Sequence, residues 1–467
     1  MRIILICFNL LLSTINVIAQ NENNIWYFGN YAGLDFNSGT PVSLNNGVLD
    51  SYDNTSTISD SAGNLLFYTN GENVWNANSL FMTNGQGIGG SSTGGQAALI
   101  IRQPFQDSIY YIFTADAFGA SGGLKYSIVN MHGSGGLGTV TQKGIVLQDT
   151  STEKLAGIHY CVGKFTWLIT HKGNSNEFYC YKIKANGLDT VPVISAVGQI
   201  HPAGPWGTVN NTAGQMSISK TGSKIGCVQF QSGKIEVFDF DLNTGIVSNP
   251  ILLNSTYQGA WGLEFSPDGT KMYLSVYTSP NIRQFDVTLG NANAISASAI
   301  SVGSTSTTAC PGFSGAVGYL QRGPDDKIYI AHCGLNYLSV INEPNKAGLL
   351  CDFVDNGVQL GNRVSTFGLS RAIANECMNT GVDDIALINI NTLFPNPNNG
   401  TFSIDISNAT GIKYLDLKIF DALGKLVFTK KSALSDFKNI QSNLDPGYYT
   451  VLLDRNNEKV IKKMIVY

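Results

Sequence analysis

Five histidines are the residues of this chain best suited to metal binding or acid–base chemistry: His132, His159, His171, His201 and His332. No two of them stand in an HxH or HExxH spacing, the patterns that bring two imidazoles onto one metal ion. His159 and His332 fall near the ends of expected strands and are the better candidates. Structural or surface roles nevertheless suit all five more closely, so the sequence predicts no metal site.

A short acidic run offers a second candidate, a calcium loop. Asp239 and Asp241 alternate ahead of Gly245, and carboxylates at alternate positions can converge on one ion. An EF-type loop needs Gly at its sixth place and Glu at its twelfth, where this chain has Thr244 and Pro250. A strand-to-hairpin turn explains the run better. We therefore expect no cofactor, with calcium as the one ion left open.

Patterns for nucleophilic catalysis and phosphate binding do not occur in the required context. No Gly-x-Ser-x-Gly elbow joins a strand to a helix, and the Gly-rich run 85–95 lacks the Lys-Ser/Thr and helix of a phosphate loop. The chain carries 29 Lys and Arg against 33 Asp and Glu, a net charge of −4. Such a balance provides no basic field for nucleic acid, so we expect no nucleic-acid partner.

The elements that would position these residues are short strands. Charged residues make up only 13% of the chain and glycines number 51 of 467, a composition typical of many strands joined by tight turns. Strand, polar turn and strand recur six times, over 54–70, 97–114, 157–170, 215–228, 261–275 and 317–331. Third strands and hairpins follow several copies, for example at 235–245, which predicts four-stranded sheets arranged radially, a β-propeller.

Both ends of this region hold incomplete copies. The run 24–36 resembles the middle of a blade without its first strand, whereas 365–372 resembles a first strand without its blade. Together they would complete a seventh blade and close the ring with strands from both ends. We therefore predict an all-β chain with a seven-bladed propeller over residues 20–375.

The N-terminus has the pattern of a secretory signal peptide. Arg2 precedes the apolar run 3–12, and small or β-branched residues at Val17 and Ala19 suit cleavage after Ala19. Residues 1–19 are thus predicted to be removed. Gln20, not cysteine, follows, so a lipid anchor has no acceptor thiol. No later run of about 20 apolar residues predicts a membrane-spanning helix.

Seven cysteines remain after the signal peptide: Cys161, Cys180, Cys227, Cys310, Cys333, Cys351 and Cys377. An odd number leaves at least one unpaired in an exported monomer. Cys161 and Cys180 fall in adjacent expected strands, and three others cluster late in the chain. One or two disulfides are expected, with the pairing open.

The repeat ends near residue 375, and the polar residues 376–390 are expected to form a linker. Residues 391–467 carry ten Lys and Arg against seven Asp and Glu, whereas residues 20–390 have a net charge of −8. This shift in charge predicts a separate domain after the linker.

The tail contains four sequence blocks, beginning Leu393-Phe394-Pro395-Asn396-Pro397 and ending Lys459 to Tyr467. In order and position the blocks resemble the type A C-terminal sorting domain of the type IX secretion system of Bacteroidota. The resemblance implies a small Ig-like β-sandwich, recognition by the type IX machinery, and a product that is secreted or held on the outer-membrane surface. The matching residues are Pro395, Asn396, Pro397, Gly400, Gly424, Pro446, Gly447, Tyr448, Lys462 and Lys463.

The repeat region is similar to extracytoplasmic propellers that carry a Ser-Pro-Asp-Gly turn, here at 266–269. That turn is a hairpin device without activity. The class includes lactonase-like enzymes, lyases, glycan binders and scaffolds, so the fold leaves the function open.

Loops before the innermost strands of a propeller converge at one mouth of its channel. Amides with aromatic platforms there would suit sugars or peptides. The alternative is that these side chains only solvate a wet channel. The candidate ligand-binding residues are Gln96, Trp206, Gln215, Gln258, Trp261 and Arg363. No clustered set of Asp, Glu and His stands at these strand entries, so the sequence favours a non-catalytic binding protein for glycan, peptide or a surface protein. The alternative is an extracellular lactonase-like hydrolase or lyase with a cation in the channel.

Overall fold

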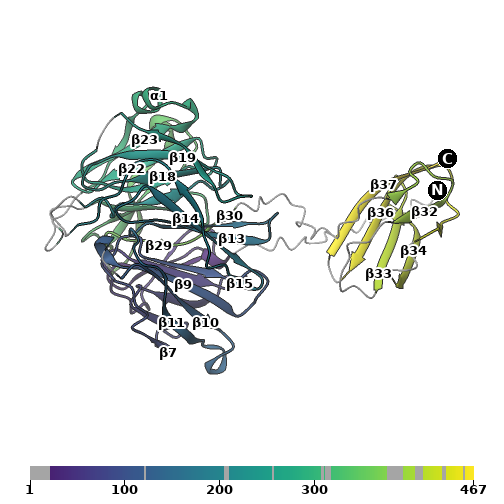
Figure 1. The fold of residues 1–467 in the computed structure, drawn as a ribbon, viewed down its shortest axis with the longest axis horizontal. Helices are drawn as coiled ribbons and strands as arrows, with labels where there is room; N and C mark the ends of the chain where they lie inside the picture. The colour runs from purple at the N-terminus through teal and green to yellow at the C-terminus, as the bar shows by residue number, and fades with distance from the viewer. Residues whose placement is uncertain are drawn as a thin grey trace, which may run out of the picture. The chain divides into compact units, whose positions relative to one another are not determined.

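The computed structural model describes residues 21–375, except 120–121, 205–209, 255–256, 307–309 and 311–316, and residues 393–467, except 405–413, 434–437 and 456–457. The chain divides into two compact units between residues 378 and 379 (Figure 1). Strands dominate both units, as predicted, and the chain is all-β. Within the described residues, no helix has the length and apolar character needed to cross a membrane.

The first unit consists mainly of antiparallel strands in successive groups of three to five. The first group is β1 (Ile25–Phe28), β2 (Ala32–Asp35) and β3 (Val42–Leu44). The second is β4 (Thr55–Ser59), β5 (Leu65–Thr69), β6 (Asn73–Asn76) and β7 (Phe81–Gln86). The third is β8 (Ala98–Arg102), β9 (Ile109–Ala115), β10 (Leu124–Asn130) and β11 (Thr139–Gln148).

Four further groups follow along the chain. The fourth is β12 (Leu155–Tyr160), β13 (Phe165–His171), β14 (Glu177–Lys184), β15 (Gly187–Leu188) and β16 (Val193–Ala196). The fifth is β17 (Met216–Ile218), β18 (Lys224–Val228), β19 (Ile235–Phe240) and β20 (Val247–Leu252). The sixth is β21 (Ala260–Phe265), β22 (Lys271–Val276), β23 (Ser279–Asp286) and β24 (Ile300–Ser304). The seventh is β25 (Val317–Arg322), β26 (Ile328–His332), β27 (Tyr337–Ile341) and β28 (Phe353–Gln359).

Helical segments in this unit are short. The helix α1 spans Ala292–Ala297. The 3-10 turns are η1 (Asn21–Asn23), η2 (Ala117–Gly119), η3 (Ser134–Gly136), η4 (Val287–Leu289) and η5 (Gly348–Cys351). They connect or precede strands, so the strands alone build the framework.

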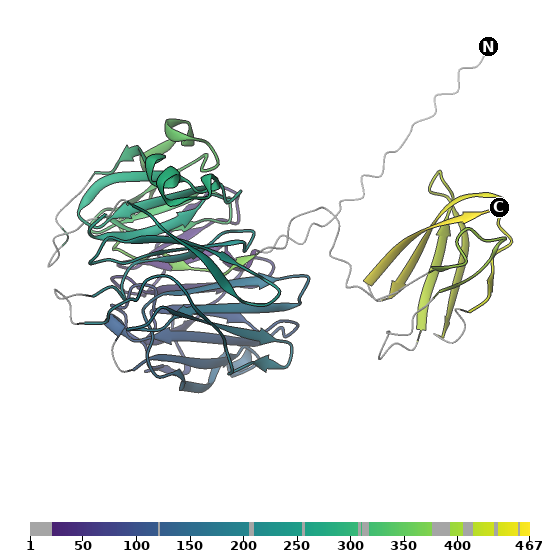
Figure 2. The same cartoon turned by 45° about the horizontal axis from the view of Figure 1, so that its top comes forward.

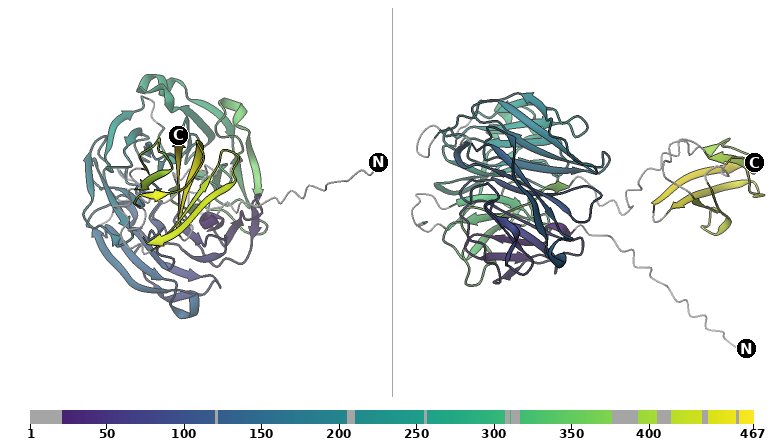
Figure 3. Two further views of the ribbon diagram at one scale, coloured as in Figure 1. Left: turned by 90° about the vertical axis from the view of Figure 1, so that its right-hand side faces the viewer. Right: turned by 60° about the horizontal axis from the view of Figure 1, so that its bottom comes forward.

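The groups pack face to face around a common centre (Figure 3), and neighbouring groups lie side by side along the chain (Figure 2). The first strands of successive groups contact one another, so they line this centre. Apolar cores fill the spaces between groups; one joins Trp167 of β13 to Phe238 of β19. The first group also packs against the seventh, where the rings of Trp26 and Tyr329 lie 5.5 Å apart. This contact closes the ring and leaves few exposed sheet faces.

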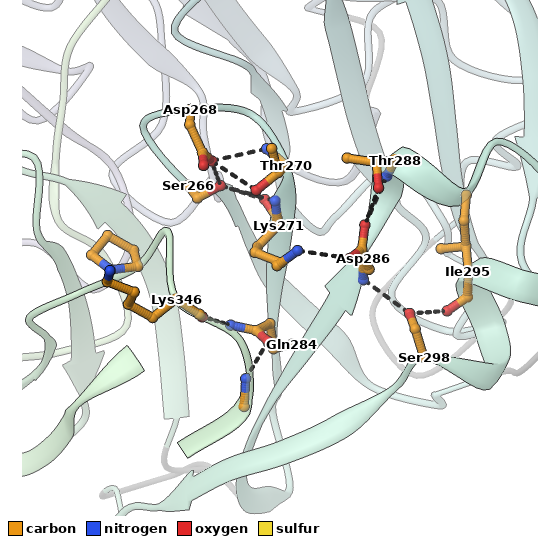
Figure 4. A network of polar contacts seen from close by, with 12 residues as sticks. Ser266, Asp268, Thr270, Lys271, Gln284, Asp286, Thr288, Ile295, Ser298 and Lys346 are labelled. Atoms are coloured by element: carbon orange, nitrogen blue, oxygen red, sulfur yellow. Dashed lines mark hydrogen bonds and ion pairs between the residues drawn. The ribbon is translucent and has the colours of Figure 1, made fainter. Parts of the chain in front are cut away.

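The Ser-Pro-Asp-Gly turn forms the hairpin between β21 and β22 (Figure 4). The Asp268 carboxylate accepts hydrogen bonds from Ser266 Oγ at 2.6 Å and from the Thr270 amide at 3.0 Å. Gly269 adopts a φ of +71°, as the turn requires. Lys271 Nζ then pairs with Asp286 Oδ2 of β23 at 2.7 Å. The predicted role of this motif as a turn is confirmed.

The second unit contains two antiparallel sheets. One sheet consists of β31 (Leu393–Phe394), β32 (Thr401–Ile404) and β35 (Ile440–Gln441). The other, in spatial order, consists of β34 (Leu426–Ala433), β33 (Tyr414–Phe420), β36 (Gly447–Arg455) and β37 (Glu458–Val466). Phe402 and Ile404 of the first sheet share one core with Leu417 and Ile419 of the second. The two sheets of the second unit therefore pack on one core.

The cysteines of adjacent expected strands, Cys161 and Cys180, do not form a disulfide with each other. A disulfide joins Cys310 to Cys333, and Cys161 is also disulfide-bonded. Cys180, Cys227 and Cys351 are free and buried. Cys161 and Cys180 therefore do not pair with each other, although their strands belong to one sheet.

Candidate functional site

The centre of the first unit holds a segment of its own chain, residues 364–375, which we call the axial segment. Val364 forms an antiparallel bridge with Asn30 at the end of β1. Further on, β29 (Ser370–Arg371) runs parallel to β4, and β30 (Ala374–Asn375) runs parallel to β12. From the sequence we expect 365–372 to be the first strand of a blade, and this stays a prediction. In the structure, the axial segment contacts the first, second and fourth groups.

Hydrogen bonds hold the axial segment at several levels. The Tyr319 amide donates to the Phe367 carbonyl at 2.8 Å, and the Phe367 amide donates to the Tyr52 carbonyl at 2.9 Å. A Cβ at Gly368 would lie 1.6 Å from the carbonyl oxygen of Asp53. Only glycine allows this approach of two backbones, so the segment fits the centre closely.

Two carboxyl groups, those of Asp53 and Glu153, are buried where the inner strands begin. Glu153 accepts hydrogen bonds from the Gly95 amide at 2.7 Å and the Phe118 amide at 2.5 Å. Burial raises the pKa of Glu153. Burial, and then the nearby Glu153, raise the pKa of Asp53 well above its ordinary value. Asp53 Oδ1 has no hydrogen-bond partner among the described residues, so this carboxyl is suited to carrying a proton.

Tyr319 reaches from β25 toward the same carboxyl groups. A Cβ at Gly95 would lie 2.0 Å from Tyr319 Oη and 3.0 Å from Glu153 Oε2. Burial, then Asp53 and Glu153, raise the pKa of this phenol well above its ordinary value. The Tyr319 hydroxyl therefore stays protonated and meets Glu153 at the Gly95 backbone.

Lys154 supplies the nearest buried ammonium group. Its Nζ donates to the carbonyls of Asn211, Thr212 and Ala213 at 2.8, 2.7 and 2.9 Å. Burial lowers its pKa to about 8. Three carbonyl acceptors use all three protons of an ammonium group. Lys154 therefore fixes the position of the loop before β17.

Two predicted ligand residues have amides that are occupied by the backbone. Gln96 donates to the Met216 carbonyl at 3.0 Å and accepts from the Met216 amide at 2.7 Å. Gln215 donates to the Leu320 carbonyl at 2.7 Å and accepts from the Leu263 amide at 2.9 Å. Both side chains link strands of different groups, and ligand binding by them stays a prediction.

The other predicted ligand residues are scattered. Trp261 is only 4% exposed and stacks on Tyr319 with ring centroids 5.1 Å apart. Gln258 is exposed, and Arg363 donates to the Asn45 carbonyl at 2.7 Å. Trp206 lies outside the described residues. The structure thus brings Trp261 to the centre beside Tyr319.

Asp53, Glu153 and Tyr319 are not among the residues predicted from the sequence. A positional signal exists: Asp53, Gln96 and Glu153 each stand two residues before the first strand of their group, at β4, β8 and β12. Equivalent positions in three successive repeats point to the same place at the centre. Two carboxylates at such positions are notable in a chain with 13% charged residues.

The histidines do not assemble into a metal site in the described residues, where no group of three His, Cys, Asp or Glu side chains could hold an ion. His171 and His201 stack with ring centroids 3.8 Å apart, and His201 Nε2 lies 4.0 Å from Glu236 Oε2. Burial, then His171, lower the pKa of His201 well below its ordinary value. This pair is therefore neutral and packs between the fourth and fifth groups.

The acidic run 239–245 forms a turn between β19 and β20. The Asp241 carboxylate accepts from the Asn243 amide at 2.9 Å and from Thr244 Oγ1 at 2.8 Å. Asp239 is paired instead with Lys224 of the neighbouring strand. The two carboxylates thus serve different partners, as the predicted hairpin turn requires.

In the second unit, Asn396 ties the first sorting block to the last strand. Its Nδ2 donates to the Lys463 carbonyl, and its Oδ1 accepts from the Ile465 amide, both at 2.8 Å. Gly400 and Gly424 adopt positive φ angles in turns, whereas Tyr448 is 73% exposed. Lys462 is half-buried and Lys463 is exposed. The blocks thus combine a fixed framework with exposed side chains.

Solved structures similar to the chain are of low identity. A candidate 6-phosphogluconolactonase from Bacteroides uniformis shares 13% identity with a TM-score of 0.44, over 72% of this chain and 98% of its own. Another from Bacteroides fragilis shares 11% identity with a TM-score of 0.41, over 90% and 96%. A periplasmic gluconolactonase from Pseudomonas aeruginosa shares 13% identity with a TM-score of 0.36, over 80% and 89%.

A comparison with curated proteins finds no match. The family described as Secretion system C-terminal sorting domain matches residues 392–467. This range includes all the tail residues that the sequence analysis singled out, and it confirms the resemblance stated there. The C-terminal part of this chain is therefore a secretion system C-terminal sorting domain.

Proposed function

We propose that this chain is a type IX-exported propeller that binds glycan, peptide or another surface protein without catalysis. The observation that supports this function is the axial segment, which fills the centre with the chain's own backbone. In the described residues, Phe367 and Arg371 of this segment are 1% and 6% exposed. A propeller closed in this way is a rigid scaffold whose outer surfaces are available for partners.

The proposed organisation has four parts. Residues 1–19 are a signal peptide, 20–375 a seven-bladed propeller closed from both ends, 376–390 a linker and 391–467 the sorting domain. The groups β1–β3 and β25–β28, which pack at the closure, support the blade count. The two sheets around one core support an Ig-like sandwich for the tail.

Export is tested by deleting residues 391–467 from the gene in a bacterium of the Bacteroidota that has type IX secretion. We expect the full protein on the cell surface or in the medium, and the truncated protein in the periplasm. A full protein that stays in the periplasm would contradict the assignment. A variant with Asn396→Ala tests the contribution of the first sorting block.

Binding is tested with the mature protein on a glycan and peptide array. Gln258→Ala and Trp206→Ala are the variants of choice at the predicted mouth, since Gln258 is exposed. Loss of a bound feature in either variant would place the ligand at that mouth. A protein that binds no feature of the array would contradict the proposed function.

A second candidate function rests on the Asp53 and Glu153 carboxyl groups. Their burial beside Tyr319 resembles the arrangement of a general acid with a raised pKa. An enzyme of this kind would be an extracellular lactonase-like hydrolase or lyase with a cation in the channel. Calcium or zinc should then raise the melting temperature, and Glu153→Gln should abolish the increase.

A further inference from the structure

A cavity of about 330 Å³ lies at the far ends of the inner strands β4, β8 and β12. Ile373 of the axial segment lines it, so the chain closes the centre at this level and leaves a pocket. We call this cavity the basal pocket. Its volume falls at the lower end of the range for small-molecule sites.

An ion pair forms one wall of the basal pocket. Arg102 of β8 pairs with Glu22 of η1 at 2.5 Å, and Arg102 Nε donates to the Gln106 carbonyl at 2.9 Å. The two paired side chains are 35% and 27% exposed. Solvent therefore reaches a fixed donor and a fixed acceptor side by side.

A neutral imidazole, that of His159, also lines the basal pocket. His159 Nδ1 hydrogen-bonds with Thr166 Oγ1 at 2.9 Å. Burial, and then the charge of Arg102, lower the pKa of His159. At neutral pH the ring is uncharged, so its second nitrogen, Nε2, serves as a polar group without adding charge to the pocket.

An aromatic ring stands at the rim. Phe105, in the turn between β8 and β9, is 65% exposed and lines the pocket. Its φ is +61°, a conformation that large side chains seldom adopt. The turn thus holds a large apolar ring in solvent beside the polar wall.

We propose that the basal pocket binds an uncharged sugar ring, the terminal unit of a glycan. Phe105 offers a stacking face, and Arg102, Glu22 and His159 offer donors and acceptors for hydroxyl groups. The proposal rests on the proposed binding function and names its ligand class.

The charges around the pocket argue against an anionic ligand. Tyr110, which packs nearby, experiences Arg102 together with Glu22, Asp60 and Asp107. Arg102, the cation of the pocket wall, is already paired with Glu22. An ammonium ligand would in turn meet Arg102 in the wall. An uncharged ligand avoids both conflicts.

The test titrates the mature full chain with methyl glucoside, methyl galactoside, methyl mannoside and N-acetylglucosamine, followed by saturation-transfer NMR and calorimetry. Glucuronate and glucosamine are the charged counterparts. We expect saturable binding of at least one neutral sugar, with glucuronate weaker. No saturable binding, or glucuronate binding more tightly than every neutral sugar, would overturn the proposal.

Variants of Phe105 locate the binding. Phe105→Asn removes the ring and keeps a residue that tolerates positive φ, and should weaken binding about tenfold. Phe105→Tyr should retain it. Phe81→Ala removes another exposed ring, 51% exposed, from β7 outside the pocket, and should leave binding unchanged. Unchanged affinity in Phe105→Asn, with its melting temperature preserved, would overturn the proposal.

The two proposals fail differently. If Phe105→Asn binds the same array features as tightly as the unmodified protein does, the proposal for the basal pocket is overturned, whereas the proposed binding function stands. If the protein binds no feature of the array and none of the sugars, the proposed binding function itself is overturned.

Discussion

The hydroxyl of Ser56 donates a 2.8 Å hydrogen bond to the carbonyl of Arg371, which follows it by 315 residues. The same hydroxyl accepts from the Ile100 amide at 3.1 Å. Arg371 in turn donates to Gln321 Oε1 at 2.9 Å. The Ser56 hydroxyl therefore joins the second and third groups to the axial segment, and the Arg371 guanidinium extends this connection to the seventh group.

Gly368→Ala should destabilise the first unit strongly. The added Cβ would overlap the Asp53 carbonyl, and neither backbone can move freely at the centre. We expect the free energy of unfolding to fall by about 1–3 kcal/mol or more, measured by urea denaturation. Gly173→Ala is the control, because its Cβ would lie no closer than 3.6 Å to Ser151; an equal loss in both variants would contradict the close fit.

Gln215→Ala should lower stability by about 1–3 kcal/mol, since the buried amides and carbonyl that Gln215 serves would lose their partners. Gln258→Ala, at an exposed position, should change it by less than about 0.5 kcal/mol. Thermal unfolding of both variants separates a structural glutamine from a surface one. Similar melting temperatures for the two variants would be inconsistent with the cross-links described for Gln215.

Replacing both Cys310 and Cys333 by serine should reduce the free energy of unfolding by about 2–4 kcal/mol. The disulfide restricts the unfolded chain across a sequence separation of 23. Denaturation is measured in the absence of reductant. The control is Cys351→Ala, which removes a buried, free thiol without removing a crosslink. The double variant should have a lower free energy of unfolding than this control.

The buried His332 should make stability depend on pH. Burial lowers its pKa from 6.5 to about 4, and Nε2 hydrogen-bonds with Ser339 Oγ at 2.7 Å. The unfolded chain takes up the proton near pH 6.5, whereas the folded ring resists it until about pH 4. The contribution of this neutral ring is therefore complete above pH 6.5 and is lost as the pH falls toward 4, by roughly 3 kcal/mol.

Denaturation between pH 7 and 4 checks this prediction. His332→Asn should flatten the decline of stability with acidification, although the variant is less stable at pH 7. His132→Asn, at a side chain 73% exposed, should leave the decline unchanged. A decline of the same steepness in His332→Asn would exclude His332 as its source.

Local sequence patterns were sufficient to predict the hairpins. Turn residues such as Pro267, Asp268 and Gly269 act on their immediate neighbours, and alternating apolar residues mark the strands beside them. The copy at 261–275 indeed gives β21 and β22, and the copy at 317–331 gives β25 and β26. Such short-range chemistry is readable from one sequence.

The centre of the first unit could not be predicted in the same way. The path of the axial segment depends on contacts with Tyr52, Ser56 and Tyr319, far away in the sequence. The repeats predict the position of Gln96 and Gln215 in their groups, and from this position we expect their amides to face a ligand. The repeats do not predict which groups of the folded chain these side chains contact. Burial of Asp53 and Glu153 arises only when the groups come together.

The axial segment also constrains when folding can finish. The axial segment lies at the C-terminal end of the first unit. A nascent chain that stops at residue 363 therefore lacks the segment that packs at the centre of this unit. Synthesis of almost the entire first unit must precede its final packing, and long-range contacts of this kind slow folding. Late closure suits the export route that we propose, because a chain that is still unfolded can pass an inner-membrane translocon.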